Sequence, residues 1–332
     1  MDHNALPSLA AGLESPTALN RRTFLHSVSQ TALLTAAAPL LLGGRIVQAA
    51  PTPTSAAESA VGRLFESLSD TQKQTIALPF DHASRTKISA NWHITKPVLR
   101  DDFFTPAQRK LADEIVKNVT SPDGYERIKL QTEDDDGGIE GYSIAFFGTP
   151  GKDKFEWELT GRHLTLRADG NTVDKAAFGG PIIYGHGESD PSKNLFHYQT
   201  KQVNEVFKAL DPAQAKAALI ATAPGESTVP LQGASGKFAG LAVKELKADQ
   251  KALVEKTLGV LLAPYRKEDV DEVFAVLKAT GGFDLLHLAF YQQGDLQDDK
   301  VWDMWRVEGP SFVWNFRGAP HVHAYINIGT VS

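Results

Sequence analysis

The chain has 332 residues, of which 42% are hydrophobic and 22% charged, a composition typical of a globular protein with an ordinary apolar core. It contains no cysteine, which excludes disulfide bonds, thiolate metal ligands and cysteine nucleophiles, so any metal site must use histidine, carboxylate or backbone oxygen ligands. The formal net charge of −6 argues against nucleic acid or an anionic membrane surface as a partner.

Residues 1–49 have the pattern of a twin-arginine (Tat) export signal. Arg21 and Arg22 precede an alanine-rich apolar run that is short for a membrane span, and small residues at Val47 and Ala49 suit a cleavage site. We therefore expect the Tat export machinery to deliver the protein to the periplasm or the medium. An N-terminal membrane anchor is the alternative. Because the Tat route exports folded proteins, some of them with a cofactor loaded, it is compatible with a bound metal.

The segment after the signal, residues 50–60, is rich in Pro, Ser and Ala and predicts a flexible leader. We expect residues 61–332 to form a single domain. Apolar residues at helical spacing predict helix over 61–76, with a break at Ser69 or Asp70.

The clearest helix start in the chain lies at Thr105, the predicted N-cap residue. Pro106 follows at the first helical position, and Gln108 suits the third position of a capping box. The acidic stretch 132–138 comes later. It lacks the ligand spacing of a calcium-binding loop, so we interpret it as a solvated turn.

The remaining chain shows strand patterns on both sides of a helical region. Extended runs bounded by Gly and Pro predict strands at 141–151 and 154–170, and a glycine-rich loop is expected at 179–192. Helical periodicity covers 199–280. Four further extended runs follow, at 283–293, 300–310, 311–318 and 321–328. Very short turns join the last three, so these strands should pair as an antiparallel meander.

This order predicts an α+β fold, with one antiparallel sheet, a C-terminal meander and a helical segment inserted between two parts of the sheet. Several common chemistries are excluded by missing motifs. The chain has neither the G-x-S-x-G elbow of α/β-hydrolases nor the H-E-x-x-H helix of common zinc peptidases. It also lacks a phosphate-binding P-loop and a dinucleotide fingerprint.

The last extended run carries two histidines one residue apart. Strand alternation places His321, His323 and Tyr325 on one face and apolar residues on the other. Two imidazoles at positions i and i+2 can both reach one metal ion, and a third histidine from a neighbouring strand would complete a site with an open position. The alternative is a polar strand face exposed to solvent.

His163 is the predicted third ligand. Alternation along its strand places it with Trp157 on a mostly apolar face, where a hydrogen-bonded core histidine is the ordinary alternative. The nearby Gly161 permits a bulge or a close backbone approach, which is frequent near functional sites. His93 and His186 are reserve ligands.

Several other polar residues could serve such a site. Glu188 follows His186 in the glycine-rich loop, and Arg306 and Glu308 stand two residues apart on one strand face. Glu308 and Glu188 are the candidate catalytic bases, and Arg306 and Tyr325 are the candidate substrate-binding residues. An ion pair between Arg306 and Glu308 at the surface is the alternative.

Three short motifs, in this order, resemble a bacterial family catalogued as domain of unknown function 3500. The matching residues are Trp157, His163 and Leu164 in the first motif, Arg306, Gly309 and Pro310 in the second, and His321 and His323 in a final His-x-His. Arg162 departs from the pattern, since many members have the first of two histidines there. The resemblance runs from about Leu68 to Ile328. It implies export, which is frequent in the family, and implies no particular reaction.

We therefore expect an exported protein with a histidine site for a divalent metal, zinc or copper, and a small-molecule substrate. Zinc would favour hydrolysis by a metal-bound water, and copper an oxidation in which Tyr325 takes part. Two alternatives stay open. One is a periplasmic module that binds a small ligand or a carbohydrate without catalysis. The other is a structural envelope protein with a solvated histidine face.

Overall fold

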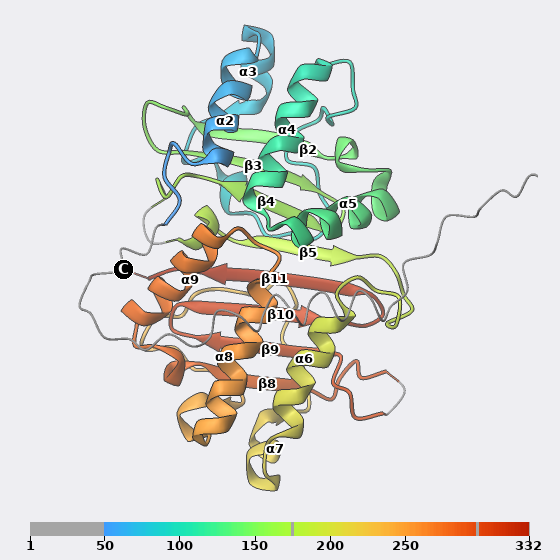
Figure 1. The fold of residues 1–332 in the computed structure, drawn as a ribbon, viewed down its shortest axis with the longest axis vertical. Helices are drawn as coiled ribbons and strands as arrows, with labels where there is room; N and C mark the ends of the chain where they lie inside the picture. Colours follow the sequence, from blue (N-terminus) through green and yellow to red (C-terminus); the bar gives the residue numbers. More distant parts are fainter. Residues whose placement is uncertain (1–49, 174–175, 297–298, 332) are drawn as a thin grey trace, which may run out of the picture. The chain divides into compact units, whose positions relative to one another are not determined.

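A single 11-stranded sheet organises the computed structural model, which describes residues 50–173, 176–296 and 299–331 (Figure 1). The strand order is β1-β2-β3-β4-β5-β11-β10-β9-β8-β6, and β7 also pairs with β8. Neighbouring strands are antiparallel except for the pairs β1/β2 and β6/β8. The strands are β1 Ala77–Leu78, β2 Ser143–Gly148, β3 Phe155–Gly161, β4 Leu164–Ala168, β5 Ile182–His186, β6 Leu219–Ile220, β7 Leu241–Ala242, β8 His287–Tyr291, β9 Met304–Gly309, β10 Phe312–Arg317 and β11 Val322–Ile328.

Helices cover one face of this sheet. Figure 1 shows α2, α4 and α5 in front of β2–β4, and α6, α8 and α9 in front of β8–β11. The helices are α2 Ala56–Ser67, α3 Asp70–Ile76, α4 Pro106–Val119, α5 Pro122–Asp136, α6 His197–Lys208, α7 Pro212–Ala218, α8 Ala248–Leu262 and α9 Lys267–Ala279. Among the described residues, no helix is both long enough and apolar enough to cross a membrane.

The two faces of the sheet differ in chemistry because side chains alternate along each strand. The face under the helices is apolar and includes the fully buried Trp157 and Trp314. The opposite face carries polar side chains such as Arg167, Arg306 and His323, and two irregular segments cover it. Residues 79–98 are one of them, and Arg167 donates a hydrogen bond to the carbonyl oxygen of Arg85 there, at 2.7 Å.

The second covering segment, residues 221–240, is called the strap below. Arg306 donates to the carbonyl oxygen of Thr228 at 2.7 Å, and Asn327 donates to that of Val229 at 2.9 Å. Val229 itself packs in a small apolar cluster with Tyr325. Polar side chains of the strands therefore hold the strap against the sheet.

The predicted helix starts are confirmed. Thr105 caps α4 in a capping box with Gln108, and Pro106 occupies its first turn. The predicted break near Ser69 is present as well, since α2 ends at Ser67 and Ser69 caps α3. The meander is confirmed too, because β9, β10 and β11 pair in chain order. The fold is α+β, as expected, with α6–α9 lying between the two parts of the sheet in sequence.

The flexible leader at 50–60 is a wrong prediction. Helix α2 begins at Ala56, and its first turns are buried. Glu58 is 2% exposed and accepts two hydrogen bonds from Arg266, the residue before α9. The small Ala side chains that suggested a linker instead allow close packing. The export signal predicted at 1–49 lies outside the described residues.

Two strand predictions need correction. The glycine-rich region at 179–192, expected as a loop, contains β5, which lies between β4 and β11 in the middle of the sheet. The run 154–170, expected as one strand, is the hairpin β3–β4. Gly161 pairs with Leu164, so Arg162 and His163 form a two-residue turn.

Candidate metal centre

Three histidine side chains meet on the polar face of the sheet. The ring centroids of His163 lie 5.0 Å from His321 and 4.8 Å from His323, and those of His321 and His323 are 4.7 Å apart. One nitrogen from each ring lies within 4.8 Å of the other two, so the three residues could hold a metal ion. The Nε2 atoms of His321 and His323 are 3.0 Å apart, within the range of about 3–4 Å for two nitrogens on one ion.

The route by which His163 joins the pair differs from the prediction. Its φ of +58° belongs to the turn between β3 and β4, and this conformation takes the residue out of the strand alternation. The side chain therefore leaves the apolar face shared by Trp157 and Leu159. A backbone hydrogen bond from His163 N to the carbonyl oxygen of Ala90, 2.6 Å long, holds the turn in place.

Gly185 provides the space in which the histidines meet. Strand β5 lies between β4 and β11, and Gly185 is directly opposite His323 in the register of β5 and β11. A Cβ atom at position 185 would lie 3.1 Å from the Cβ of His163. Because glycine has no side chain there, His163 can reach across β5 towards His323.

Asp135 orients the ring of His163. Its Oδ2 lies 2.8 Å from Nδ1 of His163, and its Oδ1 accepts a hydrogen bond from the backbone N–H of Gly187 at 3.0 Å. Burial alone would raise the pKa of this carboxyl group, but the hydrogen bonds from His163 and Gln131 outweigh burial and lower it. The ionised Asp135 fixes the proton of His163 on Nδ1, which leaves Nε2 free as a ligand.

Glu226, on the strap, orients the ring of His323 in the same way. Its Oε1 lies 3.1 Å from Nδ1 of His323 and accepts a hydrogen bond from the Tyr325 hydroxyl at 3.3 Å. Its Oε2 forms an ion pair with Arg317 at 3.1 Å. Burial acts to raise the pKa of Glu226, but the interactions with His323 and Arg317 lower it overall. Two of the three imidazoles are thus held by a carboxylate at Nδ1.

The neighbourhood favours neutral rings for His323, on β11, and for His321, which directly precedes it. Burial, together with the charges of neighbouring groups, lowers the pKa of His321 to about 4. The pKa of His323 is also lowered, mainly by burial, although Glu226 acts in the opposite direction. Neutral imidazole is the form that binds metals.

Sequence reasoning missed Asp135, Glu226 and Gly185. The acidic stretch 132–138 was expected to be a solvated turn, but its first part is the last turn of α5, and the side chain of Asp135 is 3% exposed. No local pattern marks Glu226, which is 97 residues from His323. The glycines on both sides of His186 were the one available signal, since Gly185 and Gly187 both approach the side chain of His163.

Of the other predicted residues, Glu188 and the reserve ligand His186 line one cleft of about 380 Å³. Asp135, the hydrogen-bond partner of His163, lines it as well, but the three histidines of the triad are not among its lining residues. The carboxylate of Glu188 accepts a hydrogen bond from the backbone N–H of Asp190 at 2.7 Å.

The reserve ligands do not join the triad. His186 lies on the helix-facing side of β5, and both of its ring nitrogens are occupied. Its Nε2 lies 3.0 Å from Asp134, and its Nδ1 accepts from the backbone N–H of Leu195 at 3.3 Å. His93 is exposed on the segment 79–98.

Arg306 and Glu308 lie two strands away from β11. Glu308 is opposite Val313, which is opposite Asn327, four residues from His323. Strand spacings put Glu308 roughly 15 Å from His323, so the structure does not support it as a base at the histidines. Glu308 accepts instead from Gln232 at 2.9 Å. Arg306 is 6% exposed rather than at the surface.

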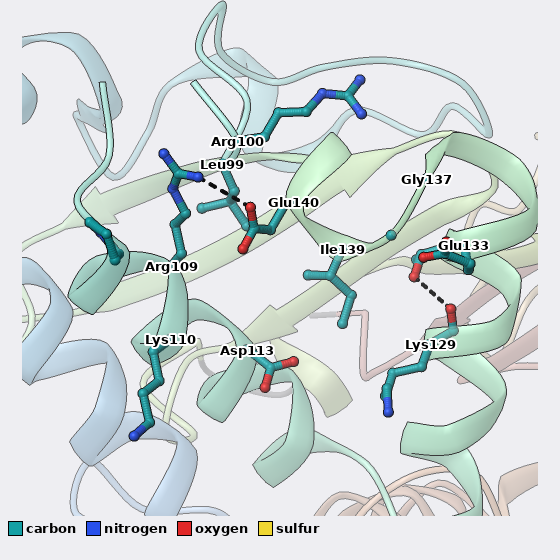
Figure 2. A pocket seen from close by; sticks show the side chains of 13 residues that line it. Leu99, Arg100, Arg109, Lys110, Asp113, Lys129, Glu133, Gly137, Ile139 and Glu140 are labelled. Carbon is teal, nitrogen blue, oxygen red and sulfur yellow. Dashed lines mark hydrogen bonds and ion pairs between the residues drawn. The ribbon is translucent and has the colours of Figure 1, made fainter. Parts of the chain in front are cut away.

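Arg306 and Glu308 line a second cleft of about 370 Å³, together with Tyr291 and the strap. A third pocket, of about 580 Å³, lies between α4 and the end of α5 (Figure 2). Charges of both signs line it, and Arg109 and Glu140 face each other across 3.3 Å. No histidine is among its lining residues, which makes the triad the stronger candidate for metal chemistry.

A family model described as "Protein of unknown function (DUF3500)" matches residues 50–327, and the chain therefore belongs to this family. The resemblance noted in the sequence is confirmed. No curated protein and no solved structure matches the chain.

Proposed function

We propose that this member of the DUF3500 family is an exported metalloenzyme that holds one divalent ion, zinc in the first place, on His163, His321 and His323. The observation that carries the proposal is a pair of carboxylates, the buried Asp135 and the partly exposed Glu226, at Nδ1 of two of the rings. Carboxylates in this position are typical partners of metal-bound histidine, because they fix the ring and leave Nε2 for the metal. Three histidines leave a tetrahedral ion with an open position.

The site supports hydrolysis better than oxidation. An ion on three neutral nitrogens would lower the pKa of a bound water, which is the chemistry that hydrolysis needs. Glu188 is the candidate base, since it lies in the cleft that Asp135, the hydrogen-bond partner of His163, also lines. An oxidation assisted by Tyr325 is less well supported, because burial and Glu226 raise the pKa of its phenol and keep the proton in place.

A second candidate function is binding of a small ligand without catalysis. The cleft with Arg306 and Tyr291 favours it, because Arg306 is buried there and polar groups line an open space. Export through the Tat route is part of both proposals and rests on Arg21 and Arg22.

The test is metal analysis of protein purified after native export. We expect about one zinc per chain, and loss of that metal in His163→Ala, His321→Ala and His323→Ala. The matched control is His186→Ala, which removes a buried histidine outside the triad. Copper in place of zinc would transfer the proposal to an oxidation, and full metal occupancy in His323→Ala would refute the site.

The orienting role of Asp135 has its own matched pair of variants. Asp135→Asn should weaken metal affinity by about 10–100-fold, because the amide no longer stabilises the proton on Nδ1 of His163. Asp134→Asn, one residue away and bonded to His186, should leave the affinity unchanged. Equal effects of the two substitutions in a competition titration would contradict the assignment.

A further inference from the structure

Arg317 has a position at the triad that its structural contacts do not fully explain. It lies on β10, directly opposite His323. Its Nη1 pairs with Glu226 at 3.1 Å, and its Nη2 lies 3.3 Å from Nε2 of His321. Its Nε is buried and has no hydrogen-bond partner among the described residues. The guanidinium group is therefore aimed at the atoms that would bind the metal.

Metal binding would free the Nη2 group of Arg317. The lone pair on Nε2 of His321 cannot both accept a hydrogen bond from Arg317 and coordinate an ion. Once the ion is bound, the N–H of Nη2 needs another acceptor close to the open coordination position. An oxygen atom of an exogenous ligand is the group that can occupy that position.

The charges around the site show which kind of oxygen fits. At the triad itself, a divalent ion and Arg317 would bring three positive charges, and the carboxylates of Asp135 and Glu226 cancel two of them. The ion with three neutral histidines thus has an excess of one positive charge, which favours an anion. A guanidinium group also matches the geometry of carboxylate and phosphate oxygens.

We propose that the metal centre takes an oxyanion, a carboxylate or phosphate group of the substrate, as its exogenous ligand. One oxygen occupies the open position of the ion and another accepts hydrogen bonds from Arg317. This inference rests on the proposed metal site and adds the class of substrate.

The experiment uses protein purified after native export and reloaded with Co²⁺, whose visible absorption reports on ligands added to the ion. We titrate it with acetate, with inorganic phosphate and with acetamide, the neutral analogue of acetate. Acetate or phosphate should perturb the spectrum at millimolar concentration, and the stronger of the two identifies the oxyanion. Acetamide should have no effect. Equal responses to acetate and acetamide would overturn the proposal.

Variants test the effect of Arg317 on anion binding separately from its effect on metal binding. Arg317→Met should weaken anion affinity by about tenfold or more while Co²⁺ affinity stays within about threefold. Arg317→Lys keeps the positive charge beside Glu226 but lacks the planar pair of N–H donors of a guanidinium group. It should show an intermediate loss of anion affinity. Arg109→Met, on α4, is the matched control.

The outcomes distinguish the two proposals. If the wild-type protein binds no Co²⁺, the metal site itself is refuted. If Co²⁺ binds and Arg317→Met and Arg317→Lys both retain wild-type anion affinity, the metal site stands and the oxyanion inference is overturned. If Arg317→Met fails to fold, Arg317→Lys decides between the same two results.

Discussion

Gly185 is the residue on which the convergence of the histidines depends. It stands between His163 and His323, and a Cβ atom there would lie 2.3 Å from the carbonyl oxygen of Val322 as well as 3.1 Å from His163 Cβ. The first of these contacts is to backbone, which cannot move aside without disturbing the pairing of β5 and β11. A single methyl group would therefore push β5 away from β11, which carries His323, and crowd His163.

We predict that Gly185→Ala lowers the free energy of unfolding by about 1–3 kcal/mol and weakens metal affinity by about tenfold or more. Urea unfolding and a competition titration measure the two effects. Gly62→Ala is the matched control, because a Cβ at that position in α2 would meet nothing within 4 Å. An intact metal affinity in Gly185→Ala would contradict the role of the glycine.

At this scale the sequence predicts the ligands better than their partners. Strand alternation predicts that His321 and His323 meet on one face; in the structure His323 lies on β11 and His321 directly precedes it. Asp135 and Glu226 could not be predicted in this way, because they reach the histidines only after α5 and the strap have packed on the sheet. The sequence pointed to His163 as the third member of the group, but not to its turn conformation.

At the scale of elements, α9 joins α2 through a buried group of charges. Arg266, before α9, donates to Glu58 on α2 and to Asp269 in its own first turn. Glu272 lies one turn further along α9 and is 7% exposed. Burial, and then the nearby charges of Asp169 and Asp269, raise the pKa of Glu272 to about 8. The helix therefore carries more carboxyl groups than the single guanidinium can neutralise.

This excess predicts a pH dependence of stability. The raised pKa means that folded protein keeps a proton on Glu272 between about pH 4.5 and 8, whereas unfolded protein has lost it. The free energy of unfolding should therefore fall as pH rises through this range, by up to about 4 kcal/mol from this group.

Glu272→Gln should remove this group's part of the slope and stabilise the protein at pH 8 and above, while Asp269, whose pKa burial raises to about 7, retains its own part. Urea unfolding at pH 5, 7 and 9 measures the effect, and Glu66→Gln, at an exposed site on α2, is the control. A slope unchanged by Glu272→Gln would show that the proton resides elsewhere in the cluster.

Elements were predictable where local patterns were regular. The capping residues of α4 and the short turns of the meander have direct structural consequences, and both were confirmed. Strand β5 was missed because Gly and Pro surround a run of only five residues. The β3–β4 hairpin was missed because its turn, Arg162–His163, contains neither Gly nor Asn, and His163 adopts a positive φ that such residues usually supply.

At the scale of the whole molecule, the predicted ligands come from parts of the chain that meet only in the folded protein. The export route proposed from Arg21 and Arg22 carries folded chains, so the metal site could form before transport. Replacing both arginines by lysine should leave the protein in the cytoplasm, because the receptor recognises the two guanidinium groups. Arg45→Lys is the matched control, and immunoblots of cell fractions give the result. Normal periplasmic yield of the double variant would refute the Tat assignment.

The proposed metal site also lies beside a short strand pairing in the middle of the sheet. Strands β4 and β5 share two residue pairs, Leu164 with Tyr184 and Thr165 with Ile183, whereas β9 and β10 share six. His163 directly precedes β4, and His323 lies on β11 beyond β5. An ion bound to both would hold β4 to β11 across the strand between them, and so support a junction that has few hydrogen bonds of its own.

We therefore predict that metal removal loosens the sheet locally. Backbone amides of β4 and β5 should exchange with deuterium about tenfold faster or more in metal-free protein. The reason is that bound metal stabilises only the state in which β4, β5 and β11 are paired. Amides of β9 and β10 should be unchanged, which provides an internal control. Adding zinc should restore protection in the wild type and fail to do so in His323→Ala. Equal acceleration in β4 and β10 would mean that the ion stabilises the fold as a whole. No change in either would mean that the pairing of β4 with β5 is stable without the ion.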